Sequence, residues 1–140
     1  MSIPVAVTLD RSIPLPERLL FLAPPPGMVG LERFTLAPLD EAGLLFALRS
    51  DDDPSVRLFV IPPVPYFPDY APDLGRDTRE TLGDDVVLLT VVSPGADGDP
   101  HTVNLLAPVV VAPDGRALQV VLEGDAWPLR APLTAAGSAA

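Results

Sequence analysis

Several reactive side chains are missing or scarce in this 140-residue chain: it has no cysteine, no lysine and one histidine, His101. Without cysteine there is no disulfide, no thiolate metal site and no cysteine nucleophile. Few bases remain that could activate a serine hydroxyl, and no serine lies in a Gly-x-Ser-x-Gly turn. Nucleophilic catalysis is therefore disfavoured, and we do not expect an enzyme.

Metal chemistry has little support either. His101 follows Pro100 in an expected loop, and no second nitrogen donor stands at ligand spacing from it. A solvent-exposed loop histidine is therefore favoured over a metal ligand or an acid–base group. The acidic stretches 51–54 and 97–100 lack the spacing of a calcium loop with its distant glutamate, and aspartate before proline favours a solvated turn. We expect no metal and no cofactor.

Positive charge is also scarce. The nine basic residues are all arginine and stand against 19 acidic residues, which gives a formal net charge of −10. Phosphate binding depends on clustered cations that release counterions, and the chain has no such cluster. Direct nucleic-acid binding is therefore disfavoured, whereas a basic protein partner suits this surface better.

The chain has no long hydrophobic run. Its first five residues lack a cationic region followed by an apolar stretch, and the apolar run 19–23 stops at three prolines. Neither a signal peptide nor a membrane span is expected. We therefore expect a cytosolic protein.

Short strand patterns separated by turn signals are abundant instead. Apolar residues alternate with smaller or polar ones in 3–9, 33–36 and 44–49, as in half-buried strands. The stretches 56–61 and 86–92 are nearly continuous apolar runs, as expected for strands covered on both faces. These patterns predict strands in all five ranges.

Two local signals near the C-terminal half are more specific. The segments 109–112 and 117–122 flank Pro113-Asp114-Gly115-Arg116, whose residues favour a hairpin turn. One short helix is predicted over 77–83, with Asp77 as its N-cap, Glu80 completing a capping box, and Gly83 as the left-handed stop.

Together these patterns predict one all-β domain. The many short strands favour a small antiparallel β-barrel or a sandwich over alternating βαβ units, with at most one or two short helices. We expect a single β-barrel-like domain over 1–133, and a flexible tail over 134–140, which is small, polar and featureless.

An aromatic, proline-rich stretch over 62–72 is the first candidate for a binding site. Its prolines exclude a central strand and hold Tyr66, Phe67 and Tyr70 on a stiff connection near the surface. Rigid aromatic rings suit a protein-binding patch. Alternatively, Phe67 closes the open end of the barrel as a core plug, with Tyr66 and Tyr70 half exposed, and the sequence favours neither interpretation.

The single asparagine, Asn104, is the second candidate. It lies in Thr102-Val103-Asn104-Leu105-Leu106-Ala107-Pro108, where its amide suits hydrogen bonding to the backbone at a bend in a strand. We favour this role slightly over direct contact with a partner.

These motifs resemble the flagellar assembly factor FliW family. The resemblance runs in order from about residue 17 to about residue 133. It is carried by Pro26-Gly27, Leu31-Glu32-Arg33-Phe34, Ser50 with Asp52-Asp53-Pro54, Phe67-Pro68-Asp69-Tyr70, Thr102-Val103-Asn104-Leu105-Leu106-Ala107-Pro108, Gln119-Val120 and Pro128-Leu129-Arg130.

The resemblance implies a small, non-catalytic β-barrel-like protein that binds flagellin in the bacterial cytoplasm. It also implies binding of the translational regulator CsrA, an RNA-binding dimer, and relief of its repression of flagellin synthesis. Flagellin and CsrA would compete for the factor. The candidate partner-binding residues are Phe67, Asp69, Tyr70, Asn104, Leu105, Leu106 and Pro108.

Two other classes stay open at this point. A small hydrolase using carboxylates would contain a carboxyl group with a strongly raised pKa in a cleft. A carbohydrate-binding β-module would carry an aromatic platform flanked by bound calcium.

Overall fold

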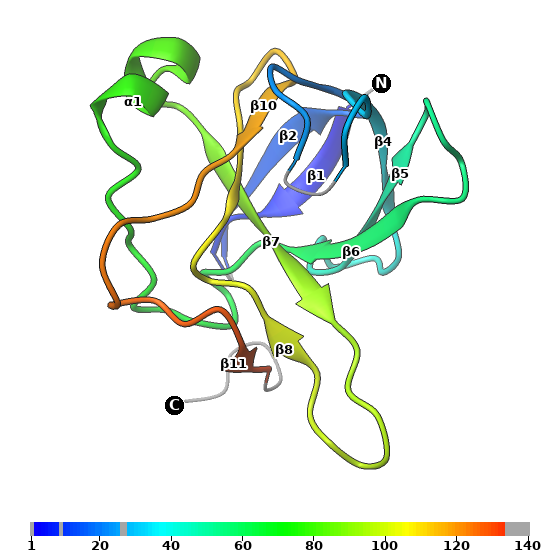
Figure 1. Cartoon of the computed structure of the whole chain (residues 1–140), viewed down its shortest axis with the longest axis vertical. Helices are drawn as coiled ribbons and strands as arrows, with labels where there is room; N and C mark the ends of the chain where they lie inside the picture. Colours follow the sequence, from blue (N-terminus) through cyan, green and yellow to red (C-terminus); the bar gives the residue numbers. More distant parts are fainter. Residues whose placement is uncertain (1, 9, 26–27, 134–140) are drawn as a thin grey trace.

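The computed structural model describes residues 2–8, 10–25 and 28–133, over which the chain forms eleven strands and one helix (Figure 1). No helix among these residues is long and apolar enough to cross a membrane. The elements are β1 (Ser2–Ala6), β2 (Ser12–Pro16), β3 (Arg18–Phe21), β4 (Arg33–Pro38), β5 (Phe46–Ser50), β6 (Arg57–Ile61), α1 (Arg76–Leu82), β7 (Val87–Ser93), β8 (Thr102–Val103), β9 (Val109–Val111), β10 (Arg116–Gln119) and β11 (Ala131–Pro132).

Seven of the described strands close into a barrel, which confirms the predicted fold class. Their order is β7-β6-β5-β4-β3-β10-β9, and β9 pairs back onto β7. Six of the seven pairs are antiparallel, but β10 and β3 are parallel. A ring with an odd number of strands cannot alternate direction at every pair, so a fully antiparallel barrel is impossible here. The short strands β8 and β11 extend from β7 outside the ring.

The barrel interior is filled by the alternating residues that the sequence predicted. Phe34 and Leu36 of β4 have no exposed surface, and neither do Phe46 and Leu48 on the neighbouring strand β5. The rings of Phe21 and Phe34 meet edge to face with their centroids 5.1 Å apart. Such edge-to-face contacts add to the stabilisation from burial.

The β1–β2 hairpin contributes a further part of this core. Ile3 and Val5 of β1 and Leu15 of β2 belong to the same buried cluster as the barrel residues. The predicted first strand is therefore present, although it ends at Ala6 and its expected last residue, Leu9, lies outside the described residues.

Strands β2 and β3 were not predicted. β2 contains two prolines, which cannot donate to a sheet, and it is tolerated because it pairs with β1 alone. β3 overlaps the apolar run 19–23, whose early stop at three prolines argued only against a membrane span. The expected coverage of 56–61 on both faces is correct only at Val60 and Ile61, because Leu58 and Phe59 are half-buried.

The predicted hairpin joins β9 and β10. Val111 pairs with Ala117, and the Ala112 N–H donates to the Arg116 carbonyl at 2.8 Å. Gly115 has φ of +95°, and a Cβ there would lie 2.8 Å from the carbonyl oxygen of Arg18. Glycine is therefore required both for the turn and for the approach of β3.

Helix α1 is present, but its predicted start is wrong. Gly75 occupies the N-cap and no side chain caps the helix, while Asp77 lies in the first turn. An acidic residue there still interacts favourably with the helix dipole. Glu80 pairs with Arg76 at 3.1 Å instead of closing a capping box. Gly83 ends the helix as predicted with positive φ, although its ψ of −175° is extended rather than left-handed helical.

Candidate protein-binding site

The predicted aromatic segment between β6 and α1 folds into consecutive turns. The Pro63 carbonyl accepts hydrogen bonds from the N–H groups of Tyr66 (3.0 Å) and Phe67 (2.7 Å), and the Phe67 carbonyl accepts from Tyr70 N–H (2.9 Å). Prolines fix φ and donate no N–H, so this segment turns rather than joining the barrel. The turns bury Tyr70 and leave Asp69 exposed.

Tyr70 anchors this segment, with only 3% of its surface exposed. Its hydroxyl donates to the Leu105 carbonyl at 2.7 Å. Its ring meets the Trp127 ring edge to face, with the ring centroids 4.7 Å apart. Burial raises the pKa of Tyr70 far above its ordinary value, so the phenol stays neutral and keeps its proton to donate.

The expectation that Tyr70 is half exposed is therefore wrong. The Leu105 carbonyl satisfies the hydroxyl of Tyr70, which removes the main cost of burying a tyrosine. Phe67 is half-buried against the apolar cluster that contains Tyr70 and Leu105. Tyr66 is half-buried as expected, and its hydroxyl donates to the Leu44 carbonyl at 2.8 Å.

Asn104 has the backbone role that the sequence favoured. Its Oδ1 accepts hydrogen bonds from the N–H groups of Leu106 (3.1 Å) and Ala107 (3.0 Å). Its own N–H donates to the Val91 carbonyl at 2.9 Å. Asn104 therefore holds the bend at which the chain leaves β8.

Four of the predicted motif segments meet in one place, which we name the motif junction: residues 67–70, 104–108, 119–122 and 127–128. The segment that follows β10 crosses from the barrel towards β11 in Figure 1. Residues 119–128 hold the 104–108 segment through four hydrogen bonds. Two are from the backbone N–H groups of Val120 to Pro108 O (2.9 Å) and of Leu122 to Leu106 O (2.8 Å). The others are from Gln119 Nε2 to Ala107 O (3.1 Å) and from Leu105 N–H to Pro128 O (3.1 Å).

The candidate partner-binding residues differ in how accessible they are at this junction. Tyr70, Leu105 and Pro108 are buried, Phe67, Asn104 and Leu106 are half-buried, and Asp69 is exposed. The junction thus has a buried support and an accessible outer layer.

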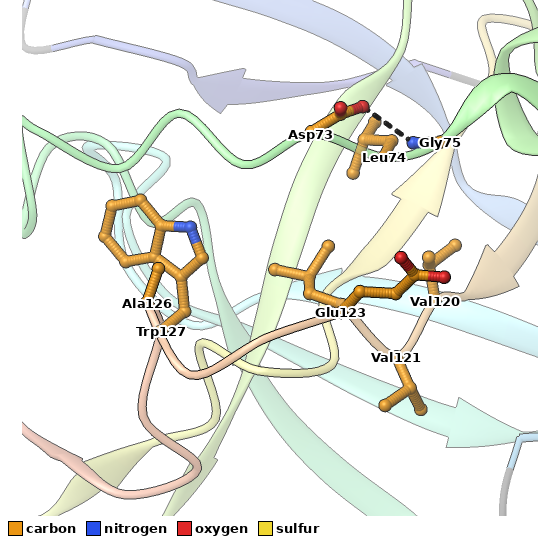
Figure 2. A pocket seen from close by; sticks show the side chains of 9 residues that line it. Asp73, Leu74, Gly75, Val120, Val121, Glu123, Ala126 and Trp127 are labelled. Carbon is orange, nitrogen blue, oxygen red and sulfur yellow. Dashed lines mark hydrogen bonds between the residues drawn. The ribbon is translucent and has the colours of Figure 1, made fainter.

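A groove of about 390 Å³, which was not predicted, lies at the border of the motif junction and shares residues 120–122 and Trp127 with it. We name it the edge groove. One wall comes from the residues before α1 and the other from the residues after β10, as Figure 2 shows. It is lined by Asp73, Leu74, Gly75, Val120, Val121, Leu122, Glu123, Ala126 and Trp127.

The edge groove combines apolar and acidic side chains. Val121 on its wall is 61% exposed. Asp73 and Glu123 form no ion pair with any described residue. The apolar run 120–122 followed by acidic residues is the sequence signal that could have indicated this wall.

The acidic stretch 51–54 serves the fold. Asp52 Oδ2 accepts hydrogen bonds from the N–H groups of Arg33 and Glu32, both at 3.1 Å. These bonds lower the pKa of Asp52, whereas a general acid needs a raised pKa. Among the described residues, no group of three or more acidic or histidine side chains could hold a metal ion.

The histidine also has a local role. His101 is exposed, and its Nδ1 accepts a hydrogen bond from Gly95 N–H at 2.8 Å. This bond closes the loop between β7 and β8, in agreement with the loop position expected for this residue.

Comparison with known proteins agrees with this architecture. The FliW protein family matches residues 11–133. The flagellar assembly factor FliW 2 of Desulfotalea psychrophila is 38% identical over 117 residues, which cover 78% of this chain and 77% of that protein. The flagellar assembly factor FliW of Bacillus subtilis is 30% identical over 120 residues, which cover 82% of this chain and 84% of that protein.

A solved structure agrees as well. The crystal structure of the flagellar assembly factor FliW superposes with a TM-score of 0.73 at 25% identity, over 94% of this chain and 96% of that chain. The resemblance seen in the sequence motifs is thus confirmed by the fold and by the relatives, and the chain belongs to the FliW family.

Proposed function

We propose that this chain is a non-catalytic flagellar assembly factor that binds flagellin in the bacterial cytoplasm and antagonises CsrA, relieving repression of flagellin synthesis. The family match over residues 11–133 carries the proposal, because the relatives from Desulfotalea psychrophila and Bacillus subtilis are named flagellar assembly factors. The scarcity of activating bases supports action by binding proteins rather than by transforming small molecules.

In this proposal, flagellin binds at the motif junction. A helix would lay its apolar face on the accessible parts of Phe67 and Leu106, next to the exposed Asp69. Tyr70, Asn104, Leu105 and Pro108 would act from beneath, because their contacts hold the two motif segments together. The half-buried apolar side chains on a well-supported surface favour this location.

Antagonism of CsrA would use the acidic surface. The net charge of −10 includes 19 carboxylates, and the two ion pairs among the described residues involve Asp114 and Glu80. A chain bound beside the RNA-binding surface would repel RNA phosphates over a Debye length of about 8–10 Å. Antagonism then requires no overlap with the RNA site.

Titration calorimetry of the purified chain with flagellin, and separately with CsrA, tests the proposal. We expect saturable binding of both and displacement of one by the other. An unrelated basic protein of similar size is the control for attraction by charge alone. Absence of binding to both flagellin and CsrA would show that the proposed function is wrong.

The electrostatic part has its own test. The RNA affinity of CsrA is measured with and without this chain across a salt series. We expect the antagonism to weaken as salt rises, provided that the protein complex remains intact. Antagonism that stays constant at high salt in an intact complex would exclude charge repulsion as its cause.

A further inference from the structure

The chain after β10 has the hydrogen-bonding pattern of an edge strand. The N–H groups of Val120 and Leu122 donate to the 106–108 segment at 2.9 and 2.8 Å. Val121 and Glu123 form no backbone hydrogen bond with any described residue. Bonded and unbonded residues therefore alternate, as they do where a strand is paired on one side and open on the other.

The open side of residues 119–123 is the side on which β10, directly before them in the chain, pairs with β3. β3 pairs with β10 only where Leu20 and Phe21 lie opposite Arg116 and Ala117, and Leu22 N–H donates to the Ala117 carbonyl at 2.9 Å. β3 ends at Phe21, so no described strand continues the pairing further along. Residues 119–123 therefore have no hydrogen-bonded strand on this side within the part of the chain that the structure describes.

The opposite wall of the edge groove has free backbone groups as well. Among the described residues, the N–H groups of Asp73 and Leu74 on this wall have no backbone partner. Gly75 N–H is satisfied by Asp73 Oδ1 at 3.0 Å, the bond drawn in Figure 2. Both walls therefore carry backbone N–H groups that no described residue satisfies, and an added chain could pair with them.

The side chains of the groove suggest the composition of such an added chain. Leu74, Val120 and Trp127 provide apolar contacts, and Asp73 and Glu123 provide negative charge without an ion-pair partner among the described residues. Successive side chains of an extended peptide point to opposite faces. A segment in which apolar and basic residues alternate would therefore match both features of the groove.

We propose that the edge groove binds an extended, basic segment of a partner protein, which adds as a strand to residues 119–123. The inference rests on the proposed role as a protein-binding factor and names a different binding mode from the helix at the motif junction. Backbone hydrogen bonds to Val121 and Glu123 supply affinity, and Glu123 and Asp73 select a lysine or arginine on the added strand.

The test uses a labelled nine-residue peptide of alternating lysine and valine and two N-methylated versions, one for each alternate set of amides. We expect the parent peptide to bind and at least one N-methylated version to bind about tenfold more weakly, because lost backbone hydrogen bonds each weaken binding several-fold. Charge is the same in all three peptides. Failure of the parent peptide to bind, or equal binding of all three, overturns the proposal.

Amide exchange measured by NMR on the wild-type chain provides a second readout with an internal control. On peptide binding, the amides of Val121 and Glu123 should gain protection, whereas those of Val120 and Leu122 are already bonded and should change little. Peptide binding without protection at Val121 and Glu123 would overturn strand addition.

A pair of variants completes the test. Val121→Pro removes an N–H that pairs with no described residue, and it should weaken binding of the parent peptide about tenfold. Val29→Pro removes an amide at an exposed site outside the groove and should leave the affinity unchanged. Equal affinities of the two variants for the parent peptide would overturn the proposal that the peptide adds as a strand to residues 119–123. These peptide results stand whether or not flagellin and CsrA bind, so failure of the proposed function is distinguished from failure of the groove assignment.

Discussion

The barrel and the edge groove contain similar aliphatic and aromatic residues but differ in how their backbones are paired. In the barrel each strand has a neighbour on both sides, and inward side chains such as Phe34 and Leu48 have no exposed surface. In the groove the segment 119–123 is paired on one side, and Val121 is 61% exposed. The barrel is therefore where substitutions should affect folding, and the groove is where they should affect binding.

The barrel side of this comparison is tested most strongly by Phe34→Ala. Phe34 is fully buried against Phe21, so its truncation should lower the free energy of unfolding by about 3–5 kcal/mol. That is a large share of the free energy of unfolding of a typical domain, which is roughly 5–15 kcal/mol. Urea denaturation measures the loss, and Phe67→Ala is the control because Phe67 is half-buried. Equal losses in the two variants would contradict the distinction between barrel and junction.

Tyr70→Phe separates support from contact at the motif junction. It keeps the ring against Trp127 but leaves the buried Leu105 carbonyl without its donor, which should cost about 1–3 kcal/mol. Tyr66→Phe is the matched control, because its hydroxyl is half-buried and water can replace it. Flagellin affinity measured on folded Tyr70→Phe should be unchanged. A stable variant that no longer binds flagellin would instead indicate direct contact by the hydroxyl.

Val121→Lys tests the groove side of the comparison. Since Val121 is exposed, stability should change by no more than about 0.5 kcal/mol. The added positive charge should weaken binding of the lysine–valine peptide about tenfold by repulsion. Fluorescence anisotropy measures the affinity, and Val29→Lys, at a 95% exposed site, controls for net charge. Equal weakening by both variants would show that the effect is not local.

The smallest expected effect concerns pH. Hydrogen bonds from the N–H groups of Arg33 and Glu32 lower the folded pKa of Asp52 from 3.8. The ionised carboxylate therefore stabilises the fold above that ordinary value, and the contribution is lost as pH falls through the lowered pKa. Thermal melts should show that the advantage of wild type over Asp52→Asn shrinks as pH falls from about 6 to about 3. An advantage that is constant over this range would contradict the charged role.

Local features of the fold were predictable because their causes lie within a few residues. The turn at Gly115, the alternation around Phe34 and the bend held by Asn104 all depend on short-range backbone conformation or periodicity. The helix start was missed by two residues, since Gly75 rather than Asp77 occupies the N-cap.

Other features depended on partners far along the chain. β2 forms despite its prolines because β1 supplies the single pairing that it needs. The burial of Tyr70 depends on the Leu105 carbonyl and the Trp127 ring, which belong to later segments. Aromatic residues on a proline-rich connection are compatible with exposure or burial, so the sequence could not distinguish a contact residue from a supporting one.

By itself, the sequence determined an acidic, mostly β chain with few reactive side chains and with motifs that identify its family. The tertiary structure alone decided the closure of β9 onto β7, the parallel pairing of β3 with β10, and the open edge at 119–123. The physical reason is that composition and periodicity determine local conformation, which depends on residues close together in the chain. Strand pairing and burial, in contrast, depend on which distant backbone and side-chain groups meet and on which are left without a partner.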